Sequence, residues 1–73
     1  MIELKKKHLK YRDGASYWEL LFKHPAGEQV ALLSKQRGLS WKPGTLPETI
    51  APLLDDWSGR HPELVDDLKK ELP

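Results

Sequence analysis

The dipeptide Asp13-Gly14 separates two segments in which apolar and polar residues alternate along the chain. Asp-Gly at such a place is typical of a two-residue type I′ β-turn, because both turn residues adopt positive φ angles there. A two-residue turn at this position pairs Leu9 with Trp18 across the two strands. The sequence therefore predicts that the chain begins with an antiparallel β-hairpin.

Alternation within the hairpin sorts its side chains onto two faces. One face is aromatic and aliphatic: Leu9, Tyr11, Trp18, Leu20 and Phe22. The other face is mostly basic: His8, Lys10, Arg12, Tyr17, Glu19 and Leu21. Ile2 and Leu4 have the wrong parity for the apolar face, so we expect either a frayed start or a β-bulge within residues 5–7.

The hairpin is expected to continue into a small sheet. A second turn is predicted at residues 24–28, where Pro and Gly interrupt the pattern. Residues 29–36 are predicted to form a third strand, and residues 38–44 a loop bounded by Gly and Pro. Residues 1–37 would then form a basic, three-stranded antiparallel sheet.

Residues 45–73 have the pattern of short helices. The Thr and Glu of residues 45–48 match a capping box. Helical spacing relates the apolar residues of this stretch: Leu46, Ile50, Leu53, Leu54 and Trp57. Pro52 should kink this helix or break it in two because it lacks an N–H donor. Pro62 suits the first position of a last helix after a turn at residues 58–61. The last helix has its own apolar stripe: Leu64, Val65, Leu68 and Leu72.

The expected fold is a single α+β domain over residues 1–73. It combines a three-stranded antiparallel N-terminal sheet with short, proline-broken C-terminal helices and a frayed end. The competing interpretation is a helix-turn-helix within residues 28–49. Against it, the recognition helix would have to contain Pro43, Gly44 and Pro47.

Charge is divided between the two halves of the chain. Up to Gly44 there are nine Lys and Arg against four Asp and Glu, whereas from Thr45 onward there are three bases against seven acids. The formal net charge of +1 hides this polarity. A one-sided distribution of charge says more about binding partners than about the fold.

The residue types of enzyme and metal sites do not occur in the required arrangements. His8, His24 and His61 lie in separate predicted elements without metal-ligand spacing. The adjacent pairs at residues 55–56 and 66–67 point about 100° apart on a helix, so they do not converge as catalytic carboxylates do. The chain has no cysteine and no phosphate-binding glycine loop. We expect no catalytic site, no metal and no cofactor.

A basic strip is the best candidate for a binding site. Its lysines and arginine can neutralise phosphates or dock on an acidic protein groove, and a neighbouring tyrosine can stack on bases. The alternative is a solvated face that keeps the hairpin soluble and protects its edge. The candidate partner-binding residues are Lys5, Lys6, Lys7, Lys10, Arg12, Tyr17, Trp41 and Lys42. Trp41 either fills the core from its loop or forms an exposed binding hot spot.

The overall character of the chain resembles a family of small bacteriophage host-takeover proteins. The features that carry the resemblance are the length, the lack of cysteine, the basic opening MIELKKKHLKYRDG and the acidic ending HPELVDDLKKELP. The similar proteins are inhibitors and antiterminators of bacterial RNA polymerase, of the type found in Xanthomonas phages. The resemblance implies binding to the N-terminal segment of the polymerase β′ subunit, blocked promoter opening, and suppressed termination with the elongation factor NusA.

Three functions remain as hypotheses. The first is a non-enzymatic, monomeric protein-binding module that acts on RNA polymerase in the bacterial host cytoplasm. The second is a small DNA- or RNA-binding protein that uses the basic hairpin. The third is a phage inhibitor of another host machine. No apolar run is long enough to span a membrane, so a membrane partner is not expected.

Overall fold

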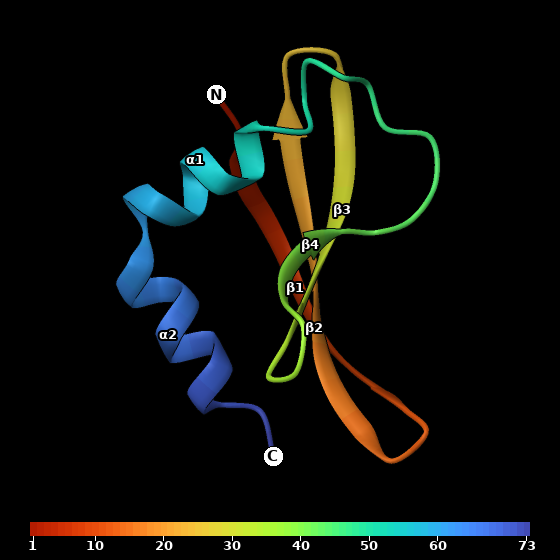
Figure 1. The fold of residues 1–73 in the computed structure, drawn as a ribbon, viewed down its shortest axis with the longest axis vertical. Coiled ribbons are helices and arrows are strands. Elements are labelled where there is room, and N and C mark those ends of the chain that lie inside the picture. Colours follow the sequence, from red (N-terminus) through yellow and green to blue (C-terminus); the bar gives the residue numbers. More distant parts are fainter.

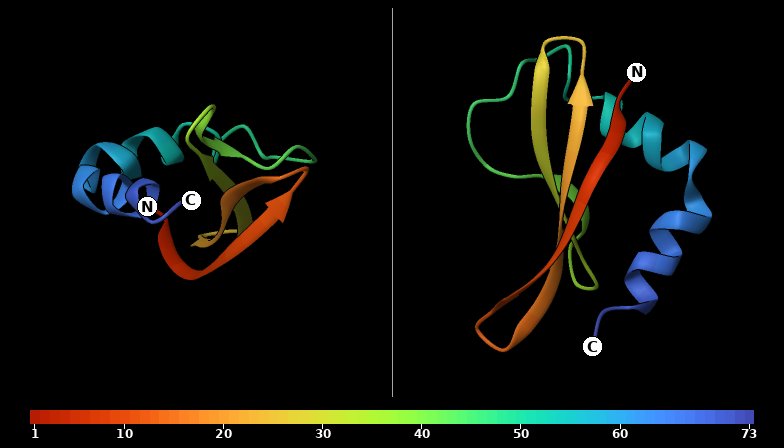
Figure 2. Two further views of the ribbon diagram at one scale, coloured as in Figure 1. Left: turned by 90° about the horizontal axis from the view of Figure 1, so that it is seen from below. Right: turned by 180° about the vertical axis from the view of Figure 1, so that it is seen from behind.

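A computed structural model describes all 73 residues as a two-layer α+β domain. Four antiparallel strands form one sheet in the order β1-β2-β3-β4, and both helices cover the same face of it (Figures 1 and 2). The predicted α+β class is confirmed. The strands are β1 (Glu3–Arg12), β2 (Ala15–His24), β3 (Gly27–Ser34) and β4 (Gly38–Trp41). The helices are α1 (Leu53–Arg60) and α2 (Pro62–Lys70).

The β1–β2 hairpin has the predicted turn and register. Asp13 and Gly14 both adopt positive φ angles, of 52° and 78°, as a type I′ turn requires. Leu9 lies opposite Trp18, as predicted. The predicted β-bulge is also present, because the pairing shifts by one residue between Leu4 and Lys6. This shift turns Leu4 toward the helices, where it packs against the core.

The sheet has four strands, so the predicted three-stranded sheet is wrong in this detail. Residues 38–44 were expected to be a loop, but Gly38–Trp41 pairs with β3 as β4. The third strand correspondingly ends at Ser34 rather than Gln36, because the chain turns immediately afterwards. The Ser34 hydroxyl accepts a 3.0 Å hydrogen bond from the Arg37 N–H within this turn, and Gly38 follows at a φ of 69°. The turn therefore returns the chain to the sheet at residues that were predicted to be a loop.

The core lies between the sheet and the helices. The sheet contributes Trp18, Leu20, Phe22, Ala31 and Leu33, and the helical half contributes Ile50, Leu54, Trp57, Val65, Leu68 and Leu72. Phe22 and Trp57 pack edge to face with ring centroids 4.8 Å apart. The Trp18 indole N–H donates a 2.7 Å hydrogen bond to the Leu68 carbonyl. This bond fixes α2 to the middle of the sheet.

Two predicted features of the helical half are wrong. Residues 45–48 do not start a helix; residues 48–52 form turns, and α1 begins only at Leu53, directly after Pro52. A helix from Thr45 would have been interrupted by Pro52 after fewer than two turns, which is too short for stability. The predicted turn at residues 58–61 is mostly the end of α1, and the chain breaks only at His61.

The remaining helical predictions agree with the structure. Pro52 prevents an earlier start of α1, and Pro62 opens α2 as expected. The apolar stripe of α2 is buried at Val65, Leu68 and Leu72, although Leu64 is exposed. The helix-turn-helix alternative is wrong because residues 28–41 contribute to strands β3 and β4.

Candidate binding face of the sheet

The face of the sheet that points away from the helices, here called the outer face, is uncovered. Strand register determines which side chains share it, because alternate residues point to opposite faces. One row across the sheet runs through His8, Glu19, Leu32 and Ser40. Neighbouring rows begin with Lys6 on one side and Lys10 on the other. The predicted basic side of the hairpin is therefore the outer face of the finished sheet.

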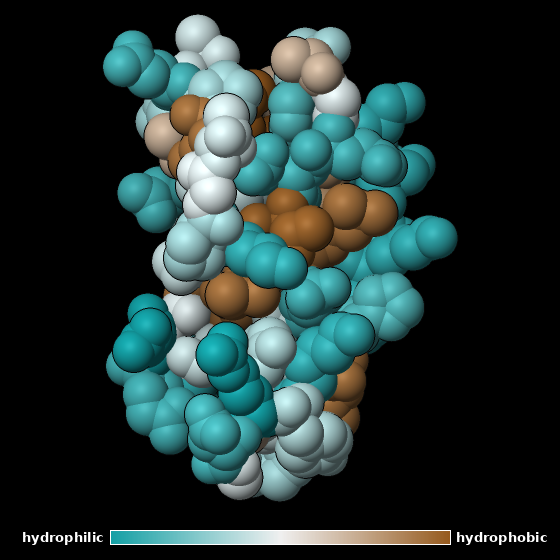
Figure 3. Space-filling model, turned by 90° about the vertical axis from the view of Figure 1, so that its right-hand side faces the viewer, coloured by the Kyte–Doolittle hydropathy of each residue, from teal (hydrophilic) through white to brown (hydrophobic).

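The centre of the outer face is apolar. Leu21, Val30 and Leu32 lie side by side on β2 and β3, and each is half-buried. Figure 3, which views the molecule from the side opposite the helices, shows hydrophobic residues in the middle of a largely hydrophilic surface. No helix or strand packs over Leu21, Val30 and Leu32, so their exposed parts are available for contact with a partner.

The basic residues of β1 are divided by the bulge. Lys6, Lys10 and Arg12 belong to the outer face and are exposed. Lys5 is the bulge residue, and its Nζ atom lies 3.7 Å from a carboxylate oxygen of Glu3. Lys7 is on the opposite, inner face of the sheet, with its ammonium 5.5 Å from the centre of the Trp18 ring. The three consecutive lysines therefore do not form one surface.

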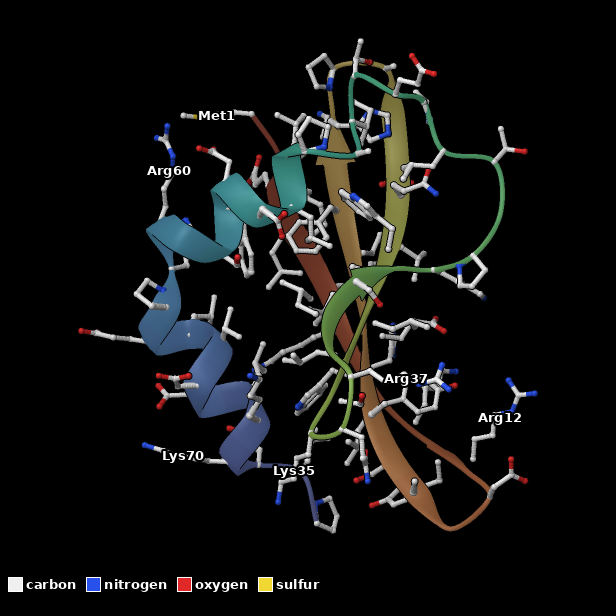
Figure 4. All side chains as sticks on the ribbon, in the orientation of Figure 1. Met1, Arg12, Lys35, Arg37, Arg60 and Lys70 are labelled. Carbon is white, nitrogen blue, oxygen red and sulfur yellow. The ribbon has the colours of Figure 1, made fainter.

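A groove of about 880 Å³ extends from the tip of the β1–β2 hairpin to the loop after β4. Its floor includes Tyr17 and Leu32, and its cationic side chains are Arg12, Arg37 and Lys42. Figure 4 shows Arg12 and Arg37 extending to the side of the sheet away from the helices. The groove thus brings together Arg12, Tyr17 and Lys42, which come from three different strands or their flanks.

Trp41 lies at the border between the groove and the core. It is half-buried, and its ring meets Phe22 edge to face with centroids 5.8 Å apart. Its indole N–H donates a 3.0 Å hydrogen bond to the carbonyl of Ala51. Trp41 therefore packs on the core and also lines the groove. Its N–H is already used within the chain.

Sequence reasoning missed Arg37 as a groove residue. Arg37 follows the predicted third strand and precedes Gly38, so it looks like an ordinary turn residue. Only the pairing of β4 with β3 brings this turn beside the hairpin tip. A signal was present in the alternation of Leu39, Ser40 and Trp41, which is too short to distinguish a strand from a loop.

The histidines occupy unrelated positions. His24 is buried, and its Nδ1 atom accepts a 3.1 Å hydrogen bond from the Ala26 N–H. His61 lies beside Trp57, with ring centroids 5.1 Å apart, and His8 is exposed on the outer face. No three His, Cys, Asp or Glu side chains are grouped so that they could hold a metal ion.

Neither the helices nor known proteins identify a partner for this face. Neither helix has the length and apolar character that crossing a bilayer requires. Comparison with protein-family models, with curated proteins and with solved structures found no match. The resemblance to phage inhibitors of RNA polymerase therefore stays a prediction.

Proposed function

We propose that this protein is a non-enzymatic binding module that docks the outer face of its sheet on an acidic surface of a protein partner. The observation that supports the proposal most is the pattern of this face. Half-buried Leu21, Val30 and Leu32 form its centre, and exposed cations surround them. An apolar centre with a polar, charged rim is the usual anatomy of a protein–protein interface.

The charged rim suits association with an acidic partner. Lys6, Lys10 and Arg12 lie on one margin of the outer face, and Arg37 and Lys42 border the groove on the other side. Rim charges of this kind accelerate encounter and select partners, although they contribute little to the stability of the fold. Binding should therefore weaken as salt screens these charges.

The proposed partner is bacterial RNA polymerase. This step rests on the resemblance to phage inhibitors and antiterminators, which points to the N-terminal segment of the β′ subunit. On this proposal the bound protein inhibits transcription initiation and promotes antitermination together with NusA. The protein acts as a monomer in the bacterial cytoplasm, and its outer face supplies the contact.

A pair of matched variants tests whether the outer face is the binding surface. K6A/K10A removes two charges from the outer face, whereas K5A/K7A removes two charges from the same strand at the bulge and the inner face. Purified bacterial RNA polymerase, immobilised on a biosensor, is exposed to each variant at moderate salt. K6A/K10A should weaken binding about tenfold, and K5A/K7A less than about threefold.

Three outcomes contradict parts of the proposal. No binding of the unaltered protein to polymerase removes the polymerase assignment. Equal losses in the two variants show that the outer face is not the contact surface. Full retention of binding in K6A/K10A also shows that the outer face is not the contact surface, provided that circular dichroism shows that both variants are folded.

A second candidate function is binding of single-stranded nucleic acid. The specific observation is that Tyr17 lies directly opposite Lys10 on the outer face, so an aromatic ring and a cation are neighbours. Bases stack on aromatic rings while cations follow the phosphates. This function predicts that log Kd changes with log salt by about 0.7 per neutralised phosphate for a single strand. Absence of binding to single-stranded or duplex oligonucleotides at low salt removes it.

A further inference from the structure

Glu19 is an acid in the middle of an otherwise basic face. It lies on β2 between His8 of β1 and Leu32 of β3, and its side chain contributes to the groove. The residue is half-buried, unlike the exposed cations around it. The three ion pairs of the structure all lie elsewhere, so no Lys, Arg or His of the chain forms an ion pair with this carboxylate.

The groove as a whole has mixed charge. Its lining contains three cations, Arg12, Arg37 and Lys42, and two carboxylates, Asp13 and Glu19. Asp13 is exposed at the hairpin tip, and its Oδ2 atom lies 3.9 Å from Nε of Arg12. Glu19 is therefore the carboxylate that a ligand lying along the groove would meet. A polyanion with evenly spaced charges would place a negative charge beside the Glu19 carboxylate, which would repel it.

We infer that the groove binds an extended segment of a protein partner whose charges follow the order acid, base, acid. The two acids face Arg12 and Lys42, and the base faces Glu19. This inference rests on the proposed function, because it names the kind of segment that the protein-binding face accepts. Charge complementarity supports it, since each of these three groove charges then has an opposite partner.

The strand register gives the spacing of the three charges. Arg12 pairs with Ala15, which is four residues from Glu19 along β2, or about 13 Å at the usual rise of a strand. Lys42 follows Ser40, which belongs to the row of Glu19, by two residues, or about 7 Å along the strands, and β4 lies two strands from β2, which adds about 10 Å sideways. Since β1 lies one strand from β2, the backbone positions of Arg12 and Lys42 are about 14 Å and about 12 Å from that of Glu19, toward opposite ends of the strands. An extended ligand rises about 3.4 Å per residue, so its base should lie about four residues from each acid, with all three side chains on one face.

Short synthetic peptides test this order directly with the full chain. The peptide SESTSKSTSES has the inferred pattern, SKSTSESTSES has the same composition in another order, and SESTSESTSES has acids alone at the charged positions. Oligo-dT serves as the nucleic-acid probe. Binding is followed at low salt by chemical-shift changes of backbone amides in β2, β3 and β4. The ordered peptide should bind at least about threefold more tightly than each of the other probes.

The variant E19Q gives the decisive comparison, because it removes only the central charge and keeps the shape of the side chain. It should raise the affinity for SESTSESTSES about fivefold and reduce the advantage of SESTSKSTSES. Tighter binding of the acidic peptide or oligo-dT to the unaltered protein overturns the inference. An unchanged order of affinities in E19Q, or no shift in the groove with any peptide, does so as well. Loss of polymerase binding in K6A/K10A with no effect in E19Q would leave the proposed function intact and reject only this inference.

Discussion

The hydrogen bond between the Trp18 indole and the Leu68 carbonyl makes a quantitative prediction about stability. The substitution Trp18→Phe keeps an aromatic ring in the core but removes the 2.7 Å bond. The Leu68 carbonyl then loses its partner in a buried place, at a cost of about 1–3 kcal/mol. The smaller ring also buries less apolar area, which adds about 1 kcal/mol. We expect Trp18→Phe to lower the free energy of unfolding by about 2–4 kcal/mol.

This loss is large for a domain of this size. The whole stability of a small domain is about 5–15 kcal/mol, and 1 kcal/mol corresponds to a Tm shift of about 4–8 °C. The measurement is urea unfolding followed by far-ultraviolet circular dichroism, which does not depend on tryptophan fluorescence. A matched control is Trp41→Phe, which removes a 3.0 Å bond to Ala51 at an exposed place, where water can replace the donor. The control should cost less than about 1.5 kcal/mol, and equal losses in the two variants would refute the assigned role of the buried bond.

Three further predictions concern the turn, the bulge and the outer face. Gly14→Ala should lower stability by about 1 kcal/mol in urea unfolding, because Gly14 has a φ of 78°; no change would contradict the turn. Deletion of Lys5 should cost less than about 1 kcal/mol by the same assay, because the pairs Leu4–Phe22 and Lys6–Leu21 then become consecutive and Leu4 stays on the inner face; a loss of about 2 kcal/mol or more would contradict the assignment of Lys5 as the bulge residue. Leu32→Ser should weaken polymerase binding about tenfold on the biosensor, and Leu64→Ser on α2 should not; equal effects would count against an apolar centre on the outer face.

The hairpin could be predicted from sequence because its determinants are local. Asp13-Gly14 specifies the turn, and the turn alone determines that Leu9 faces Trp18. The same alternation separated the core side of β2 from the outer face correctly. Parity also required either a bulge or a frayed start, because Ile2 and Leu4 otherwise point the wrong way, and the structure has the bulge.

The features that escaped prediction depend on contacts between distant segments. The position of the bulge within residues 5–7 decides that Lys7 faces inward over Trp18, and parity could not choose among the three lysines. β4 is four residues long, so its alternation is indistinguishable from a loop until β3 pairs with it. Arg37 joined the candidate site only through that pairing.

The bulge at Lys5 also bears on self-association. β1 is an edge strand of ten residues, and such an edge offers unpaired backbone groups to a second copy of the chain. The bulge interrupts the regular spacing of those groups, and lysines on both faces of the strand repel an identical partner. Removing Lys5 would therefore straighten the edge, while Leu4 and Lys7 keep their inward positions. The irregularity that aligns the core side chains also protects the chain against edge-to-edge aggregation.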